Sequence, residues 1–191
     1  SCDVHESGTT CRLLTAVLAA GHGRFRVHGA PRMHRRPIGE LTTALTAQGA
    51  KFRFEDLPGY PPFVLEASGL AGGMAAIGLG ESSQYLSGLL LAAPMAAAPL
   101  TVEITGGHVV SWPYVGLTLQ AMRDFGVLFD VSVRESGGER QDNGGWKLAD
   151  WRSLKAVRPG LVRFRVRPSV YRAGRYTVEG DWSGASYLLA A

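Results

Sequence analysis

The chain has 191 residues, of which 46% are hydrophobic and 19% charged, so it can bury a core and is neither a disordered tail nor a small scaffold held by disulfides. Its longest apolar stretch, residues 86–100, is shorter than the roughly 20 residues that a membrane span needs. Two cysteines, Cys2 and Cys11, are too few for a four-thiolate metal site, and we expect no signal peptide before them. We therefore expect a cytoplasmic protein without a membrane segment.

The net charge of +4 is distributed unevenly along the chain. No acidic residue lies between Glu6 and Glu40 or between Asp150 and Glu179, while arginines accumulate in both segments. Arginine predominates among the 20 basic residues, and its planar guanidinium suits carboxylate and phosphate groups. This favours an anionic ligand, although solvated loops would account for the same charges.

The pattern of apolar and turn-forming residues predicts a helix close to the start of the chain. Residues 7–10 supply hydroxyl groups that cap free N–H groups, and the run 12–20 is strongly helical. Gly49 and Gly126 each end a later helix and lead into a strand. The elements expected in the first part of the chain are helix 12–20, strand 25–28, helix 38–48, strand 51–54, strand 63–66 and strand 74–77.

A second series of elements repeats the first at offsets of 73 to 77 residues. Residues 10–14 match residues 83–87, and a third copy begins at Ser183. The extra length before the third copy falls on residues 136–160, a polar, Gly-rich segment that we interpret as an insertion or a long hairpin loop. The elements expected in the second copy are a helix from residue 83, strand 100–105, helix 114–125 and strand 128–133.

The repeated unit of about 75 residues is of βαβαββ type and predicts an α+β fold built from pseudo-symmetric copies. Units of this length cannot each bury a core, so the copies should pack around a common axis. The abrupt start and end of the pattern indicate a fragment of a longer protein.

Two helix starts are candidate anion sites because a helix N-terminus offers free N–H donors and a partial positive charge. They comprise residues 8–10 and residues 82–84, both rich in hydroxyl groups. Simple N-capping would explain either one alone. The pseudo-symmetry strengthens the anion-binding interpretation, since two equivalent sites would face one region.

The loop of residues 29–39 is a third candidate, with three arginines between Pro31 and Pro37. The prolines restrict the backbone and so lower the entropy cost of aiming an arginine at an anion. A solvated basic loop is the alternative. The histidines lack metal-ligand spacing with cysteines or carboxylates, so we expect no metal. No nucleophile elbow or phosphate loop of the usual sequence is present.

Taken together, six motifs resemble the EPSP synthase family, the 3-phosphoshikimate 1-carboxyvinyltransferases, and they occur in the order of that family. The motifs are residues 7–14, 31–39, 60–62, 82–86, 111–114 and 178–181. The resemblance implies the enolpyruvyl transferase fold, an alpha-beta prism or inside-out α/β barrel with two lobes of three βαβαββ copies each. Residues 1–178 would then form part of a substrate-binding lobe, with the insertion near 134–160, and residues 179–191 would begin the crossing into the second lobe.

The same resemblance implies transfer of the enolpyruvyl group of phosphoenolpyruvate to the 5-hydroxyl of shikimate 3-phosphate, with release of phosphate. This is a step of the shikimate pathway to chorismate and the aromatic amino acids. It implies no cofactor, no nucleic-acid or membrane partner, and a cytoplasmic enzyme that is monomeric at full length. The family's proton-transferring groups belong to the other lobe, so residues 1–191 alone should be inactive.

Site residues follow from the resemblance position by position. Gly8 and Arg32 match positions for phosphoenolpyruvate, and the herbicide glyphosate competes at Gly8. Ser82, Ser83 and Ser111 match contacts of shikimate 3-phosphate. Gln84 lies between the two substrates.

The chain departs from the family pattern at two positions near these motifs. Glu6 stands where asparagine is usual, which puts a carboxylate beside an expected anion site, and Trp112 stands where lysine is common. Neither Glu6 nor Asp181 lies in a convincing general-acid setting, so we assign no catalytic residue within the chain.

Two alternatives to this function stay open at the level of sequence. A basic nucleic-acid-binding or RNA-processing module of related βαβαββ fold would use the two arginine clusters. Enolpyruvyl transfer to UDP-N-acetylglucosamine would use the same fold, but the paired serines with glutamine and the loop 32–39 match the shikimate branch better.

Overall fold

A computed structural model describes residues 1–134 and 145–178 of the chain. The first half forms a four-stranded sheet with the strand order β1-β2-β4-β3, in which β1 runs parallel to β2 and the other pairs are antiparallel. Two helices and a short 3-10 turn connect these strands. The elements are β1 Cys2–Asp3, α1 Gly8–Ala20, β2 His22–His28, the 3-10 turn Met33–Arg35, α2 Gly39–Ala47, β3 Lys51–Phe54 and β4 Phe63–Ser68.

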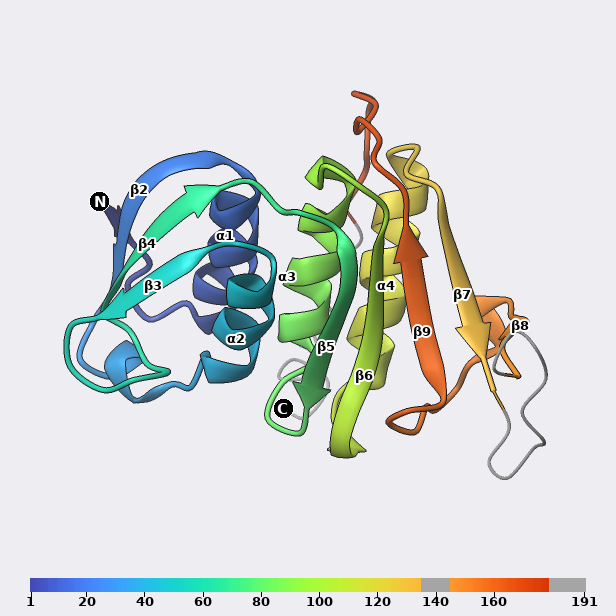
Figure 1. Cartoon of the computed structure of the whole chain (residues 1–191), viewed down its shortest axis with the longest axis horizontal. Helices are drawn as coiled ribbons and strands as arrows, with labels where there is room; N and C mark the ends of the chain where they lie inside the picture. Colours follow the sequence, from blue (N-terminus) through green and yellow to red (C-terminus); the bar gives the residue numbers. More distant parts are fainter. Residues whose placement is uncertain (135–144, 179–191) are drawn as a thin grey trace, which may run out of the picture.

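The second half forms a five-stranded sheet with the strand order β5-β6-β9-β7-β8. Here β5 and β6 are parallel, and the remaining pairs are antiparallel. The elements are β5 Gly73–Leu79, α3 Gln84–Ala92, the 3-10 turn Ala93–Met95, β6 Leu100–Val109, α4 Trp112–Asp124, β7 Phe129–Val133, β8 Lys147–Leu148, the 3-10 turn Trp151–Ser153 and β9 Val162–Val166. Figure 1 shows the two sheets next to each other, with α3 between the helices of the first half and α4.

The two sheets have the same connectivity, which confirms the predicted βαβαββ repeat. Each begins with a parallel pair, β1–β2 or β5–β6, and each places its last-formed strand, β4 or β9, in the interior. The strand predicted at 74–77 opens the second unit as β5. Strand β8 has no counterpart in the first sheet, because it comes from the insertion.

The helices end where the sequence predicts, at left-handed glycines. Gly49 has φ of +105° and Gly126 has φ of +81°, a region that residues with a Cβ rarely adopt. Helix α4 begins two residues earlier than predicted, at Trp112, because Pro113 in the first turn needs no hydrogen-bond acceptor for its nitrogen.

Helices α1 and α3 pack closely along the boundary between the two units. A Cβ on Gly88 would lie 3.1 Å from the carbonyl oxygen of Arg12 and 3.2 Å from the Cβ of Ala16. Only a residue without a side chain fits there without displacing a neighbour. The shared core continues from this contact to the inner faces of both sheets, where Phe63, Leu65 and Phe164 are completely buried.

The described part of the insertion is packed against the second unit. The indole nitrogen of Trp112 in α4 donates to the carbonyl oxygen of Leu154 at 2.7 Å. The ring of Trp151 lies 6.4 Å from that of Phe129 on β7, measured between centroids, and reaches the surface of α4 at Gly116. Residues 151–157 therefore cover the edge of the second core, which the polar composition of the segment did not indicate.

Two of the sequence predictions lie outside the described residues. They concern the third copy of the repeat, from Ser183, and the first part of the insertion. Within the described ranges, no helix is long and apolar enough to cross a membrane.

Two residues of the insertion, the half-buried Trp151 and the exposed Leu148, should differ in their contribution to stability. Trp151→Ala should lower the free energy of unfolding by about 1.5 to 3 kcal/mol, because the half-buried ring packs against Phe129 and α4. Leu148→Ala is the matched control, since Leu148 is 76% exposed and should change stability by no more than about 0.5 kcal/mol. Urea unfolding of the full protein that carries this chain measures both, and equal effects would contradict the packing described here.

Candidate functional site

The start of α1 is capped as the sequence predicts. Ser7 has extended backbone angles, and its hydroxyl accepts a hydrogen bond from the backbone N–H of Thr10 at 3.1 Å. The remaining N–H groups of the first turn have no acceptor within the helix. Gly8 is buried at this end of the helix.

Arg36 is the arginine that lies beside Gly8. A Cβ on Gly8 would collide with the Arg36 guanidinium, whose Cζ is 3.1 Å from that position. The same guanidinium donates from Nη1 to the backbone carbonyl oxygen of Glu6 at 3.5 Å. Arg32, the residue chosen from the sequence, is exposed at the N-cap of the 3-10 turn Met33–Arg35. Its role in binding stays a prediction.

The unusual Glu6 meets Arg36 through its backbone, so this contact is independent of the side chain at that position. The side chain of Glu6 is exposed. The replacement of asparagine by glutamate is therefore compatible with the observed position of Arg36.

The start of α3 has two buried serines. Ser82 is 8% exposed and accepts a hydrogen bond from the backbone N–H of Gln84 at 3.2 Å, so it serves as a cap. Ser83 is 2% exposed, and its side chain makes no capping hydrogen bond. Ser111, at the start of α4, has a left-handed backbone with φ of +54° and also makes no capping hydrogen bond with its side chain.

These residues line one pocket of about 400 Å³ between the starts of α1, α3 and α4. All four residues predicted for shikimate 3-phosphate contribute to it: Ser82, Ser83, Gln84 and Ser111. Gly8 and Arg32 are not among its lining residues, so the two predicted subsites are separate in this structure. The structure thus brings the start of α3 and the start of α4 together on one pocket, beside α1.

Several lining residues were given no role from the sequence. Arg12 in α1 and Tyr114 and Thr118 in α4 border the pocket from two sides, and the carboxylate residue Glu81 lines it just before α3. Tyr114 is 59% exposed, which is unusual for a large aromatic residue on a helix. The sequence feature that could have identified Tyr114 as a pocket residue was its place beside Ser111 and Pro113 in one of the matched motifs.

Gln84 joins the two helix starts across the boundary between the units. Its amide nitrogen donates to the hydroxyl of Thr9 at 2.8 Å, and its amide oxygen accepts from Nη1 of Arg12 at 2.9 Å. The first turn of α3 is therefore fixed directly to the first two turns of α1. This contact places the pocket and the Gly8 end of α1 side by side.

Two ionisable groups near the pocket stay protonated at neutral pH. Burial is the largest cause that raises the pKa of Tyr85 to about 12, and burial likewise raises the pKa of Cys11 to about 11. The Tyr85 hydroxyl is accordingly a donor, and it binds the carbonyl oxygen of Pro37 at 2.8 Å. Asp181, the other carboxylate considered from the sequence, lies outside the described residues.

The described residues contain no group of three histidine, cysteine or carboxylate side chains that could hold a metal ion.

The comparisons with known proteins agree with the motifs. The family model described as EPSP synthase (3-phosphoshikimate 1-carboxyvinyltransferase) matches residues 1–148. The chain belongs to the EPSP synthase family. It is 39% identical over 186 residues to the 3-phosphoshikimate 1-carboxyvinyltransferase of Marinomonas sp. strain MWYL1 and 40% identical over 186 residues to that of Sulfurovum sp. strain NBC37-1. Both matches cover 97% of this chain and 38% of the relative.

A solved EPSP synthase from Acinetobacter baumannii has a similar fold. Its TM-score is 0.61 at 20% sequence identity, over 90% of this chain and 31% of that one. The predicted α+β fold of the enolpyruvyl transferase type is thereby confirmed. The chain spans a little over a third of the length of its EPSP synthase relatives, and none of these matches favours a nucleic-acid-binding module or transfer to UDP-N-acetylglucosamine.

Proposed function

We propose that the protein carrying this chain transfers the enolpyruvyl group of phosphoenolpyruvate to the 5-hydroxyl of shikimate 3-phosphate and releases phosphate. The observation that carries the proposal is the convergence of Ser82, Ser83, Gln84 and Ser111 on one pocket in a member of the EPSP synthase family. Ser111 lies 27 residues after Gln84 in the sequence, and all four share the phosphoshikimate role implied by the motifs.

The pocket is chemically suited to a phosphorylated sugar-like acid. Serine hydroxyls and the glutamine amide would donate to phosphate oxygens. The wall of the pocket also holds Arg12, whose guanidinium is hydrogen-bonded to Gln84, and the carboxylate residue Glu81. The N-terminus of α3 adds the partial charge of the helix and its first-turn N–H groups. These hydrogen-bond donors fit a phosphorylated ligand.

We assign phosphoenolpyruvate to the start of α1. Gly8 is buried beneath the guanidinium of Arg36, which is itself exposed to solvent. A carboxylate or phosphate there would accept hydrogen bonds from that guanidinium and from the helix end. Arg32 is a second cation on the same loop.

This chain supplies binding groups and leaves proton transfer to other parts of the protein. We propose that residues 1–178 form part of one lobe of a two-lobed enzyme and that residues 179–191 begin the crossing into the other lobe. General acid and base groups on the opposite lobe would protonate the methylene carbon and take up the hydroxyl proton. We expect a cytoplasmic, monomeric enzyme without a cofactor, and no turnover from residues 1–191 alone.

The paired serines provide a test of the phosphoshikimate site. In the full protein, Ser82→Ala combined with Ser83→Ala should raise the KM for shikimate 3-phosphate at least about tenfold, since each hydrogen bond to a charged group is worth roughly 1.5 to 3 kcal/mol. Steady-state phosphate release from the two substrates measures the effect. Ser68→Ala, at the end of β4, is the control and should leave the KM unchanged. An unaltered KM in the double variant would refute the assignment.

The two arginines of the loop provide a matched pair for the phosphoenolpyruvate site. Arg36→Ala should raise the KM for phosphoenolpyruvate about tenfold or more, because it removes a charged donor from beside Gly8. Arg32→Ala should raise it less than about threefold: both arginines are exposed, but it is Arg36 that lies against Gly8. A larger rise in KM for Arg32→Ala than for Arg36→Ala would show that Arg32, and not Arg36, binds phosphoenolpyruvate.

A further inference from the structure

Arg12 occupies a central position among the residues that surround the two candidate subsites. It lies in the second turn of α1 and is half-buried. Its Nη1 donates to the amide oxygen of Gln84 at 2.9 Å, and its Nη2 donates to the backbone carbonyl oxygen of Pro37 at 3.4 Å. Its Cζ lies 5.2 Å from the centre of the Tyr85 ring.

The contacts of Arg12 and Tyr85 converge on a single backbone oxygen. The hydroxyl of Tyr85 donates to the same Pro37 carbonyl at 2.8 Å. Pro37 directly follows Arg36, the arginine beside Gly8, and it precedes the first turn of α2. The end of the arginine loop is therefore attached to α1 through Arg12 and to α3 through Tyr85.

The hydrogen bonds of Arg12 go to neutral groups that themselves lie next to a subsite. Gln84 lines the pocket of the serines, and Pro37 anchors the loop that carries Arg36. The two Nη groups of one rigid, planar guanidinium thus hold one element of each subsite at a fixed separation. A lysine ammonium on a flexible stem would reach one of these acceptors at a time.

We propose that Arg12 is a positioning residue that fixes the Gln84 amide and the Pro37 carbonyl relative to α1, and so sets the two substrates of the reaction next to each other. This inference rests on the proposed function, because it assigns the pocket and the Gly8 end of α1 to the two reacting molecules. Its effect is on orientation, since a misplacement of the order of 1 Å between reacting groups costs about 100-fold in rate.

The kinetic test uses Arg12→Met, which keeps an unbranched apolar side chain but loses both donors. In the full protein, kcat should fall about tenfold to 100-fold, while the KM for each substrate should rise less than about threefold. Arg12→Lys, which can keep one of the two hydrogen bonds, should recover part of the lost kcat. A large rise in either KM with little change in kcat would show that Arg12 binds that substrate directly, and would overturn the proposal.

A double-mutant cycle tests whether Arg12 acts through Gln84. In a Gln84→Ala background the effect of Arg12→Met on kcat should shrink to about threefold, because the amide that Arg12 orients is gone. Independent action would instead give the product of the two single effects, which would contradict the inference. If Arg12→Met does not fold, Arg12→Lys takes its place in the cycle.

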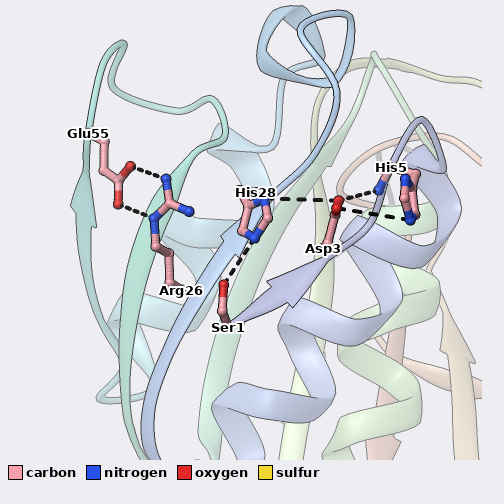
Figure 2. A network of polar contacts seen from close by, with 6 residues as sticks. All are labelled: Ser1, Asp3, His5, Arg26, His28 and Glu55. Atoms are coloured by element: carbon pink, nitrogen blue, oxygen red, sulfur yellow. Dashed lines mark hydrogen bonds and ion pairs between the residues drawn. The ribbon is translucent and has the colours of Figure 1, made fainter.

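Arg26→Met is the control for loss of an arginine with two hydrogen bonds. Nε and Nη2 of Arg26 donate to the two carboxylate oxygens of Glu55, each at 2.8 Å, on the first sheet (Figure 2). These groups lie outside both subsites, so kcat and both KM values should match those of the parent.

Hydrogen exchange separates failure of the inference from failure of the proposed function. Without substrates, the backbone amides of residues 38–48 should exchange faster in Arg12→Met than in the parent or in Arg26→Met, because the loop end has lost its anchor. A parent that does not turn over the two substrates would refute the proposed function, and this measurement would still test the anchor. Unchanged exchange in Arg12→Met would refute the inference in either case.

Discussion

The close approach of α1 and α3 is the contact on which the rest of the site depends. At Gly88 the backbone of α3 comes within van der Waals distance of α1, because neither a Cβ on Gly88 nor a larger residue at Ala16 separates the helices. Both helices begin near the pocket, so a short separation between their axes also brings their N-termini together. Two partial positive charges then face the same region, which is a favourable arrangement for two anionic ligands.

Pseudo-symmetry creates the two helix starts, and sequence divergence gives them different chemistry. The first start has Gly8 and a nearby arginine, which present backbone and fixed charge. The second has Ser83 and Gln84, which present a hydroxyl and an amide. The hydrogen bond from Gln84 to Thr9 joins the first turns of the two matching helices, although the two residues are not equivalent in the repeat, where Gln84 matches Cys11. A duplicated unit has thus become one asymmetric site.

Local signals in the sequence were sufficient to predict the helices, the strands and the repeat. They were not sufficient to predict the contacts that tertiary packing determines. The Ser7 cap and the helix ends at Gly49 and Gly126 depend on neighbouring residues alone, so they could be predicted. The position of Arg36 depends on how the 3-10 turn Met33–Arg35 directs the loop toward α1, which spacing does not reveal. The packing of Trp151 was missed for a similar reason, because a few apolar residues in a polar segment show no periodicity.

Burial limits which of the groups near the pocket can accept a proton at neutral pH. Burial keeps the thiol of Cys11 and the hydroxyl of Tyr85 protonated far above neutral pH, so neither group serves as a base there. The hydroxyl of Tyr85 is already committed to the Pro37 carbonyl, and the guanidinium of Arg12 cannot lose a proton. Such groups stabilise negative charge without exchanging protons. In the function proposed above, a preorganised set of them would lower the energy of anionic states while an acid and a base act from the other lobe.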